Sequence, residues 1–407
     1  MRMFRRLKNL APDLIYRIAI ILVSSLYLRK FFQMFDGYQY PTWGYSTYLV
    51  NYQGGFVRRG LPGEFLLQLY KITGIDPYIF LMSAYCLLLS LILILWVRYI
   101  GRFDLISRML LLLNPAFIVM PLSQDSSLLC KEWIIGTILV SFAHLSLQRK
   151  RHRMSHSSYE IIVLWVYIPT LGLLALSHEE QFFLLPIYLF LFINATKTFD
   201  NSFRWTTFFR PIPLIMMCTQ TFILIAVVKH HGSPKQAKEV FESIPSNFQA
   251  RQYIIDSMGW SLDQSRAMTN TLLTSPSTIF TFAVCILLGP VLIYFLISGY
   301  EKRYRITHFL LLLPLGLLFF VGWDWGRWIL LVTFSVIALT YFQDMESPKL
   351  NMQFSIKALC SILIGILILS VTVKVPNCCV QEWTGFTTLE LISNNVKEIL
   401  AYRANGD

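Results

Sequence analysis

The chain has 407 residues, of which 55% are hydrophobic and 14% are charged, and its formal net charge is +12. Soluble domains carry about 25% charged residues, so this composition excludes an ordinary water-soluble protein. The basic residues lie mostly in short segments between long apolar runs, which argues against a nucleic acid as partner and favours an orientation signal in a membrane. The seven cysteines show no metal-ligand spacing and predict no disulfide framework. We therefore expect one membrane domain over residues 1–407.

Apolar runs that approach the length of a bilayer core, about 20 residues, recur along the chain. The basic start, with Arg5 and Arg6, leads into the first run, and we expect this run to be a retained span because no small-residue cleavage site follows it. The predicted spans are 12–33, 77–98, 106–122, 132–148, 160–178, 181–196, 211–229, 276–298, 306–322, 327–343 and 354–374. The predicted fold class is an all-α, polytopic transmembrane helical bundle of about eleven spans.

The distribution of lysine and arginine predicts the orientation of this bundle. If the basic N-terminus lies in the cytoplasm, every second loop should also be basic, as the positive-inside rule requires. The predicted inner loops contain, among others, Arg98, Arg149, Lys197, Lys302 and Lys349. We therefore expect the N-terminus inside and the C-terminus outside, with external segments that include residues 35–76, the long loop 230–275 and the tail 375–407.

The external loop 230–275 is too long to be a simple connection. Its sequence predicts three short amphipathic helices, Ser233–Ile244, Ser246–Met258 and Ser261–Leu273, separated by Pro245 and Gly259. Their apolar sides suit a helical cap over the membrane domain. An interfacial anchor on the lipid surface would explain them equally well.

The first external segment holds a glycine-rich stretch, Asn51 to Glu64, around the adjacent Arg58 and Arg59. Glycine lets a backbone turn sharply or come close to a ligand, and paired guanidinium groups match the oxygens of a phosphate. Positive charge is disfavoured on this side of a membrane, so the two arginines favour a phosphate-binding role. The alternative is a turn whose charges face lipid headgroups.

A second set of ionisable residues lies where two predicted spans follow each other with almost no loop. It consists of His178, Glu179 and Glu180. Charged groups near membrane depth are costly and usually face a polar cavity. A carboxylate or imidazole in such a place can accept a proton during a reaction. A solvated helical turn is the alternative.

The sequence from Trp323 to Trp328 combines aromatic rings with an ion pair. Asp324 and Arg327 are three residues apart and can pair on a helix. Trp323 and Trp325 could stack on the apolar faces of sugar rings. An aromatic belt at the membrane interface explains the same tryptophans.

Two further acidic residues are candidates. Asp125 and Lys131 follow a predicted helix that Asn114-Pro115 interrupts, and broken helices at membrane depth usually line cavities. We expect these residues to bind substrate, although helix capping explains Asp125 as well. Asp36 lies just beyond the first span, where many membrane glycosyltransferases keep a catalytic carboxylate. Capping or solvation is the alternative for Asp36.

The arginines, carboxylates, histidine and aromatic residues thus gather on one predicted face, which suits a sugar carried on a lipid phosphate. In these motifs (Gly54 to Leu61, Lys131-Glu132, His178-Glu179 before Phe182-Phe183, and Asp324 to Trp328) the chain resembles bacterial polysaccharide-cluster membrane proteins. Its organisation is similar to that of Wzy-type O-antigen and capsular polymerases, with a GT-C-like bundle and one large external loop.

The resemblance implies a reaction and a location in the bacterial inner membrane. A growing glycan on undecaprenyl pyrophosphate would be transferred to a new lipid-linked repeat unit. Arg58, Arg59 and Arg327 would neutralise the pyrophosphate, and Glu179 or His178 would accept the proton of the attacking hydroxyl. No cofactor or metal is expected. The expected partners are undecaprenyl-pyrophosphate-linked glycans, membrane lipid and, as one further partner, a chain-length regulator protein.

Two other functions stay open on the sequence. One is a GT-C glycosyltransferase that uses a polyprenyl-phosphate sugar, with Asp36 as the base and often a divalent metal. The other is a lipid-oligosaccharide flippase, for which polar residues spread through the midplane and repeated halves would be expected.

Overall fold

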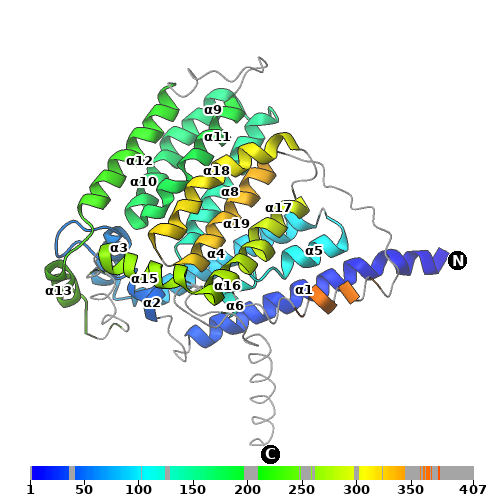
Figure 1. Cartoon of the computed structure of the whole chain (residues 1–407), viewed down its shortest axis with the longest axis horizontal. Coiled ribbons are helices and arrows are strands. Elements are labelled where there is room, and N and C mark those ends of the chain that lie inside the picture. The colour runs from blue at the N-terminus through cyan, green and yellow to red at the C-terminus, as the bar shows by residue number, and fades with distance from the viewer. Residues whose placement is uncertain are drawn as a thin grey trace, which may run out of the picture.

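The computed structural model of the chain describes residues 2–35, 42–101, 103–123, 129–196, 210–246, 262–297, 302–322 and 324–343, with a few single positions outside these ranges. All elements within these residues are helices (Figure 1). They are α1 (Arg2–Phe35), α2 (Thr42–Ser46), α3 (Gly60–Thr73), α4 (Pro77–Ile100), α5 (Leu105–Leu112), α6 (Met120–Ser123), α8 (Glu132–Lys150), α9 (His156–Ile162), η1 (Val163–Tyr167), α10 (Ile168–Ser177), η2 (Glu179–Leu184), α11 (Leu185–Thr196), α12 (Pro211–Lys229), α13 (Pro234–Ser243), α15 (Leu262–Thr274), α16 (Pro276–Ile286), η4 (Leu287–Val291), α17 (Leu292–Ile297), α18 (Lys302–Val321) and α19 (Trp325–Phe342). The all-α prediction is confirmed for this part of the chain.

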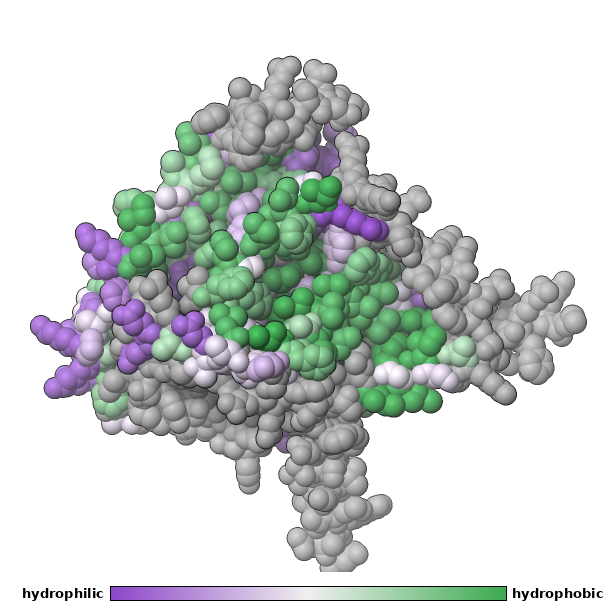
Figure 2. Space-filling model, viewed as in Figure 1, coloured by the Kyte–Doolittle hydropathy of each residue, from purple (hydrophilic) through white to green (hydrophobic). Residues whose placement is uncertain are grey.

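Five helical segments among the described residues are long and apolar enough to cross a membrane. They are Pro77–Ile100, His156–Ser177, Pro211–Lys229, Thr278–Leu296 and Trp325–Phe342. Hydrophobic surface covers much of the helical body, and polar residues gather near α13 at one end (Figure 2). Large apolar side chains are exposed on these helices, for example Leu87 and Phe222, as expected for contact with lipid. These features indicate a membrane protein, whereas the count of eleven spans stays a prediction.

Helix α19 lies at the centre of the bundle and determines where the site forms. Protein buries 89% of the residues in this apolar helix, and α8 is its principal neighbour. Gly136 of α8 has no side chain, so the ring of Phe334 lies directly on the α8 backbone. Helices α8 and α19 begin at the same end of the bundle, because Glu132 and Arg327 in their first turns are in contact there. Charged side chains at this end of the two helices are therefore surrounded by protein and not by lipid.

The chain is not one straight helix over residues 106–122, where a span was predicted. Helix α5 ends at Leu112, a series of turns follows, and α6 begins at Met120. Pro115 lacks an N–H group and disfavours helical geometry at the residue before it. The Asn114 side chain accepts a hydrogen bond from the Ala116 N–H and donates one to the Leu288 carbonyl. The break is thus stabilised by local hydrogen bonds.

The two longest external segments of the prediction pack on each other. The Arg58 N–H donates to the His230 carbonyl at 2.9 Å, and Asn51 Nδ2 donates to Ser243 Oγ at 3.0 Å. Val240 of α13 is fully buried. Helices predicted at 233–244 and 261–273 are confirmed as α13 and α15. The predicted helix 246–258, the last predicted span and the tail 375–407 lie almost wholly outside the described residues.

Candidate functional site

Three charged residues form a partly exposed group at the end of the bundle, here called the outer cluster: Arg58, Arg59 and Glu179. Arg59 donates from Nε to Glu179 Oε2 at 3.0 Å and from Nη2 to Oε1 at 2.6 Å. Arg58 donates from Nη1 to the same Oε1 at 3.4 Å. The three side chains are between 21% and 27% exposed, so solvent reaches them. The geometry offers two guanidinium groups around one anion.

The backbone of Arg59 is part of this geometry. Its φ angle is 64°, in the left-handed region that non-glycine residues rarely adopt. Arg59 immediately precedes α3, and Gly60 begins that helix. A non-glycine residue keeps this unfavourable backbone conformation only where surrounding contacts stabilise it. The two hydrogen bonds to Glu179 are such contacts.

The glycine-rich loop is held against the N-terminal part of α3. The Glu64 carboxylate accepts hydrogen bonds from the Tyr52 N–H at 3.1 Å and from Gln53 Nε2 at 3.0 Å. A Cβ at Gly63 would collide with the backbone of Val50. The glycine and the carboxylate therefore explain why this stretch folds back on its own helix.

Next to the outer cluster lies a second group, here called the inner cluster: Glu132, His178, Glu180, Asp324 and Arg327. All of its members are buried except Asp324, which is partly exposed. Nη1 of Arg327 lies 3.4 Å from Glu132 Oε1, and the Arg327 guanidinium also pairs with Asp324. The His178 ring lies between two carboxylates, with Nε2 3.8 Å from Glu132 Oε1 and Nδ1 3.8 Å from Glu180 Oε2. Glu132 is fully buried and His178 is 1% exposed. Its members come from α8, α19 and the segment between α10 and α11.

The aromatic residues of α19 pack inside this end of the protein. Trp328 Nε1 donates to Glu180 Oε1 at 2.8 Å. Trp325 is buried and its ring contacts Phe282 and Phe319. The expected stacking of Trp325 on a sugar therefore does not fit this packing, because only 4% of the residue is exposed.

Lys131 is a buried residue that contacts two other segments of the chain. Its Nζ donates to the Thr47 and Ser177 carbonyls, both at 3.1 Å, and lies over the ring of Tyr48. Burial, together with the nearby charge of Arg59, lowers the pKa of Lys131 to about 7. Lys131 therefore ties the first external segment to the end of α10.

The two clusters differ in their electrostatics. Burial alone would raise the pKa of Glu179, but the guanidinium groups of Arg59 and Arg58 outweigh it and hold that pKa well below its ordinary value. Burial and then the charge of Glu132 raise the pKa of Glu180 to about 8. The outer carboxylate is therefore firmly ionised, whereas the inner cluster carries more negative charge than it can easily hold.

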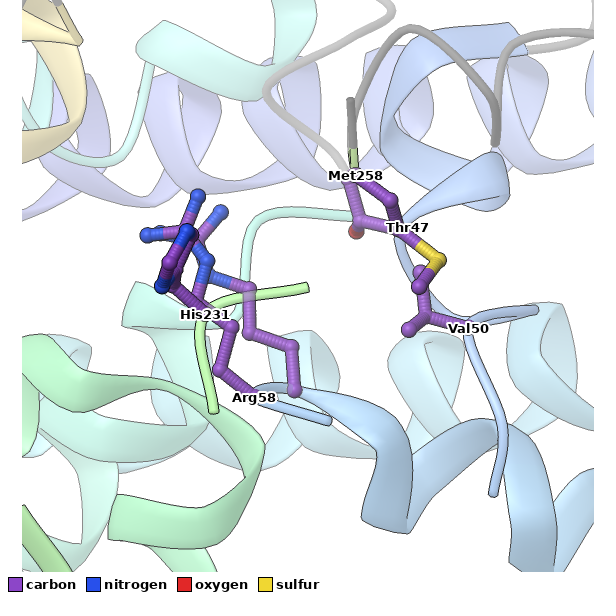
Figure 3. A pocket seen from close by; sticks show the side chains of 6 residues that line it. Thr47, Val50, Arg58, His231 and Met258 are labelled. Atoms are coloured by element: carbon purple, nitrogen blue, oxygen red, sulfur yellow. The ribbon is translucent and has the colours of Figure 1, made fainter. Parts of the chain in front are cut away.

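A small pocket opens beside the outer cluster. It is lined by Thr47, Val50, Arg58, Arg59, His231 and Met258. Figure 3 shows Arg58 and His231 on one side of this pocket and Thr47, Val50 and Met258 on the other. The pocket is about the size of a single water molecule, so a larger group could reach the two guanidinium groups only if the surrounding side chains move.

The structure brings together most of the residues that the sequence singled out. Arg58, Arg59, Lys131, His178, Glu179, Glu180, Asp324 and Arg327 lie in or beside the two clusters. Asp36, Asp125 and Trp323 lie outside the described residues. Glu132 was not among the predicted site residues, although an ionisable pair with Lys131 at the start of an apolar run is a signal that could have identified it.

Comparison of the chain with protein-family models, with curated proteins and with solved structures finds no match. Any conclusion about function therefore rests on the residues of the site.

Proposed function

We propose that this protein is a polysaccharide polymerase of the bacterial inner membrane. It would transfer a growing glycan from undecaprenyl pyrophosphate to a new lipid-linked repeat unit, on the outer face of the membrane. The observation that carries the proposal is the convergence of Arg58 and Arg59 on one carboxylate, beside a pocket at the end of an apolar bundle.

The substrate class follows from charge and position. Two guanidinium groups that share one anion present several N–H donors in fixed planes, which matches a pyrophosphate better than a single carboxylate. The site lies next to helices with exposed apolar side chains, so a substrate with a long lipid tail could leave the tail in the bilayer. A phosphate attached to a lipid satisfies both conditions.

The reaction would begin with an exchange of ion-pair partners. The incoming pyrophosphate would take over Arg58 and Arg59, and Glu179 would lose the hydrogen bonds that keep it a weak base. The freed carboxylate would then accept the proton of the attacking sugar hydroxyl as the new glycosidic bond forms. The bond to the pyrophosphate would break, and the arginines would stabilise the charge on that leaving group.

Glu179 is the better of the two predicted bases. His178 is 1% exposed and lies next to the outer cluster, between Glu132 and Glu180. A substrate hydroxyl would have to displace protein to reach it. Arg327 is likewise buried beside Glu132, so its effect on the leaving group would be through space and not through contact.

The proposal is tested by deleting the gene and separating the surface glycans by size. We expect long chains to be lost while single repeat units stay attached to their lipid acceptor. A strain that lacks the repeat unit altogether would contradict polymerase action, because an earlier step would then be blocked.

A further inference from the structure

The inner cluster contains more hydrogen-bond acceptors than its neighbours can satisfy. Both carboxylate oxygens of Glu132, both ring nitrogens of His178 and Oε2 of Glu180 are buried and have no hydrogen-bond partner among the described residues. These three side chains face one another. An imidazole N–H could donate to either carboxylate, but both nitrogen–oxygen distances are 3.8 Å, which is too long for a hydrogen bond. Buried polar groups without partners are strongly destabilising. A shared positive ion would pair with one donor atom from each of the three side chains.

The net charge of the inner cluster also favours a bound cation. Within ion-pair distance, Glu132, Glu180 and Asp324 supply three carboxylates, and Arg327 supplies the only guanidinium to this described set. With its three carboxylates ionised and His178 neutral, the set carries two net negative charges. Lys131 does not neutralise them directly, because its Nζ donates to two backbone carbonyls. A divalent cation would balance this set.

The spacing of the donor atoms fits a metal ion. One oxygen of Glu132, one ring nitrogen of His178 and one oxygen of Glu180 lie within 4.8 Å of one another. Metal–ligand bonds of about 2.0–2.2 Å place three ligand atoms about 3.3–3.8 Å apart around one ion, so the side chains would have to close by up to about 1.5 Å. Arg327 approaches Glu132 at Oε1, which leaves Oε2 for an ion.

We propose that Glu132, His178 and Glu180 bind one divalent transition-metal ion. A donor set of two carboxylates and one imidazole suits Mn²⁺ or Zn²⁺. The ion would link the start of α8 to the segment that joins α10 to α11. Glu179 stands between two of these ligands in the sequence, so the ion would hold its carboxylate toward Arg58 and Arg59.

This inference does not rest on the proposed reaction, because it concerns only what the buried side chains bind. It revises the expectation that no metal is needed, which was drawn from the arginines alone. In the proposed reaction the pyrophosphate is still bound by the outer cluster, and the ion has a positioning role.

Metal binding can be measured on the purified full-length protein without any activity assay. The protein is stripped with a chelator, titrated with Mn²⁺ and followed by electron paramagnetic resonance and by thermal unfolding. We expect one Mn²⁺ ion per chain, a rise of Tm on addition of Mn²⁺, and displacement of the signal by Zn²⁺. If the wild-type chain binds no Mn²⁺, the proposal is wrong, and the cluster holds protons instead.

Variants locate the ion. Glu132→Gln and Glu180→Gln should each weaken Mn²⁺ binding by at least about tenfold. Glu160→Gln is the matched control, because it removes a carboxylate 3.3 Å from a different histidine, His156, and should bind Mn²⁺ as the wild type does. Unchanged binding by the folded Glu132→Gln and Glu180→Gln chains, or loss of binding in Glu160→Gln, would overturn the assignment. Because the wild-type measurement stands alone, misfolding of one variant does not leave the proposal undecided.

The metal proposal and the polymerase proposal can fail separately. A chain that binds no Mn²⁺ but whose loss abolishes long glycans refutes the metal site and leaves the reaction. If the chain binds Mn²⁺ but deletion of its gene leaves the glycans unchanged, the polymerase reaction is refuted and the metal site stands.

Discussion

Arg59 holds the carboxylate of Glu179 with two hydrogen bonds, from Nε to Oε2 at 3.0 Å and from Nη2 to Oε1 at 2.6 Å. The two residues are 120 positions apart in the chain. They join the loop before α3 to the segment after α10. This planar, two-point contact pairs the positive charge of Arg59 with the carboxylate of Glu179.

The two-point contact predicts that the arginines are not equivalent. Arg59→Lys should lower the free energy of unfolding by about 1–3 kcal/mol, because lysine cannot make both charge-assisted hydrogen bonds. Arg58→Lys is the matched control in the same loop and removes only one contact at 3.4 Å. Thermal unfolding in detergent should therefore show a lower Tm for Arg59→Lys than for Arg58→Lys. The reverse order would contradict the hydrogen-bond geometry.

The buried pair of Arg327 with Glu132 predicts a larger effect. Arg327→Met should destabilise the protein by about 3–5 kcal/mol, because it leaves buried carboxylates without their guanidinium. Arg210→Met is the control, since Arg210 is exposed and lies beside Thr196 at the opposite end of the bundle. We expect the amount of folded protein after a heat step to fall sharply for Arg327→Met alone. Equal losses for both variants would argue against a buried ion pair.

The contact between α8 and α19 predicts opposite outcomes for two glycine substitutions. Gly136→Ala places a Cβ into the ring of Phe334 and should lower the free energy of unfolding by about 1–3 kcal/mol. Gly316→Ala in α18 meets nothing within 4 Å and should be neutral or stabilising by up to about 1 kcal/mol, since alanine favours a helix. Comparison of the two Tm values checks this packing. A tolerated Gly136→Ala would mean that the two helices are further apart.

The predicted orientation can be tested by chemical labelling. Lys235 in α13 and Arg153 after α8 are both exposed, and the positive-inside pattern puts them on opposite sides of the membrane. In intact cells Lys235→Cys should react with a membrane-impermeant thiol reagent, whereas Arg153→Cys should react only after lysis. The unsubstituted chain measures the background from native cysteines. Labelling of Arg153→Cys in intact cells would reverse the orientation.

Much of the site could be predicted from sequence because charge at the ends of apolar runs is a strong signal. Arg58, Arg59 and Glu179 stand out against a composition with few charged residues, and their grouping follows once the helices are placed. Their pairing could not be predicted. It depends on the left-handed backbone of Arg59 and on the way that segments distant in the chain fold together.

Other features depend on tertiary contacts that leave no local pattern. The break after α5 was visible as Asn114-Pro115, but the stabilising bond from Asn114 to the Leu288 carbonyl comes from a helix far along the chain. Glu132 looks like an ordinary first-turn carboxylate of α8 in sequence. Only the approach of Arg327 and His178 shows that it lies in a buried cluster.

We propose that the outer cluster extends a lipid-linked glycan. The most direct test is the glycan size ladder of a deletion strain that expresses the wild-type chain, Arg58→Ala or Glu179→Ala, with membrane levels of each protein checked. We expect full ladders for the wild type, and only single repeat units for both variants at normal protein levels. Wild-type ladders from either variant would remove that residue from the site, and wild-type ladders from both would show that the outer cluster does not carry out the reaction.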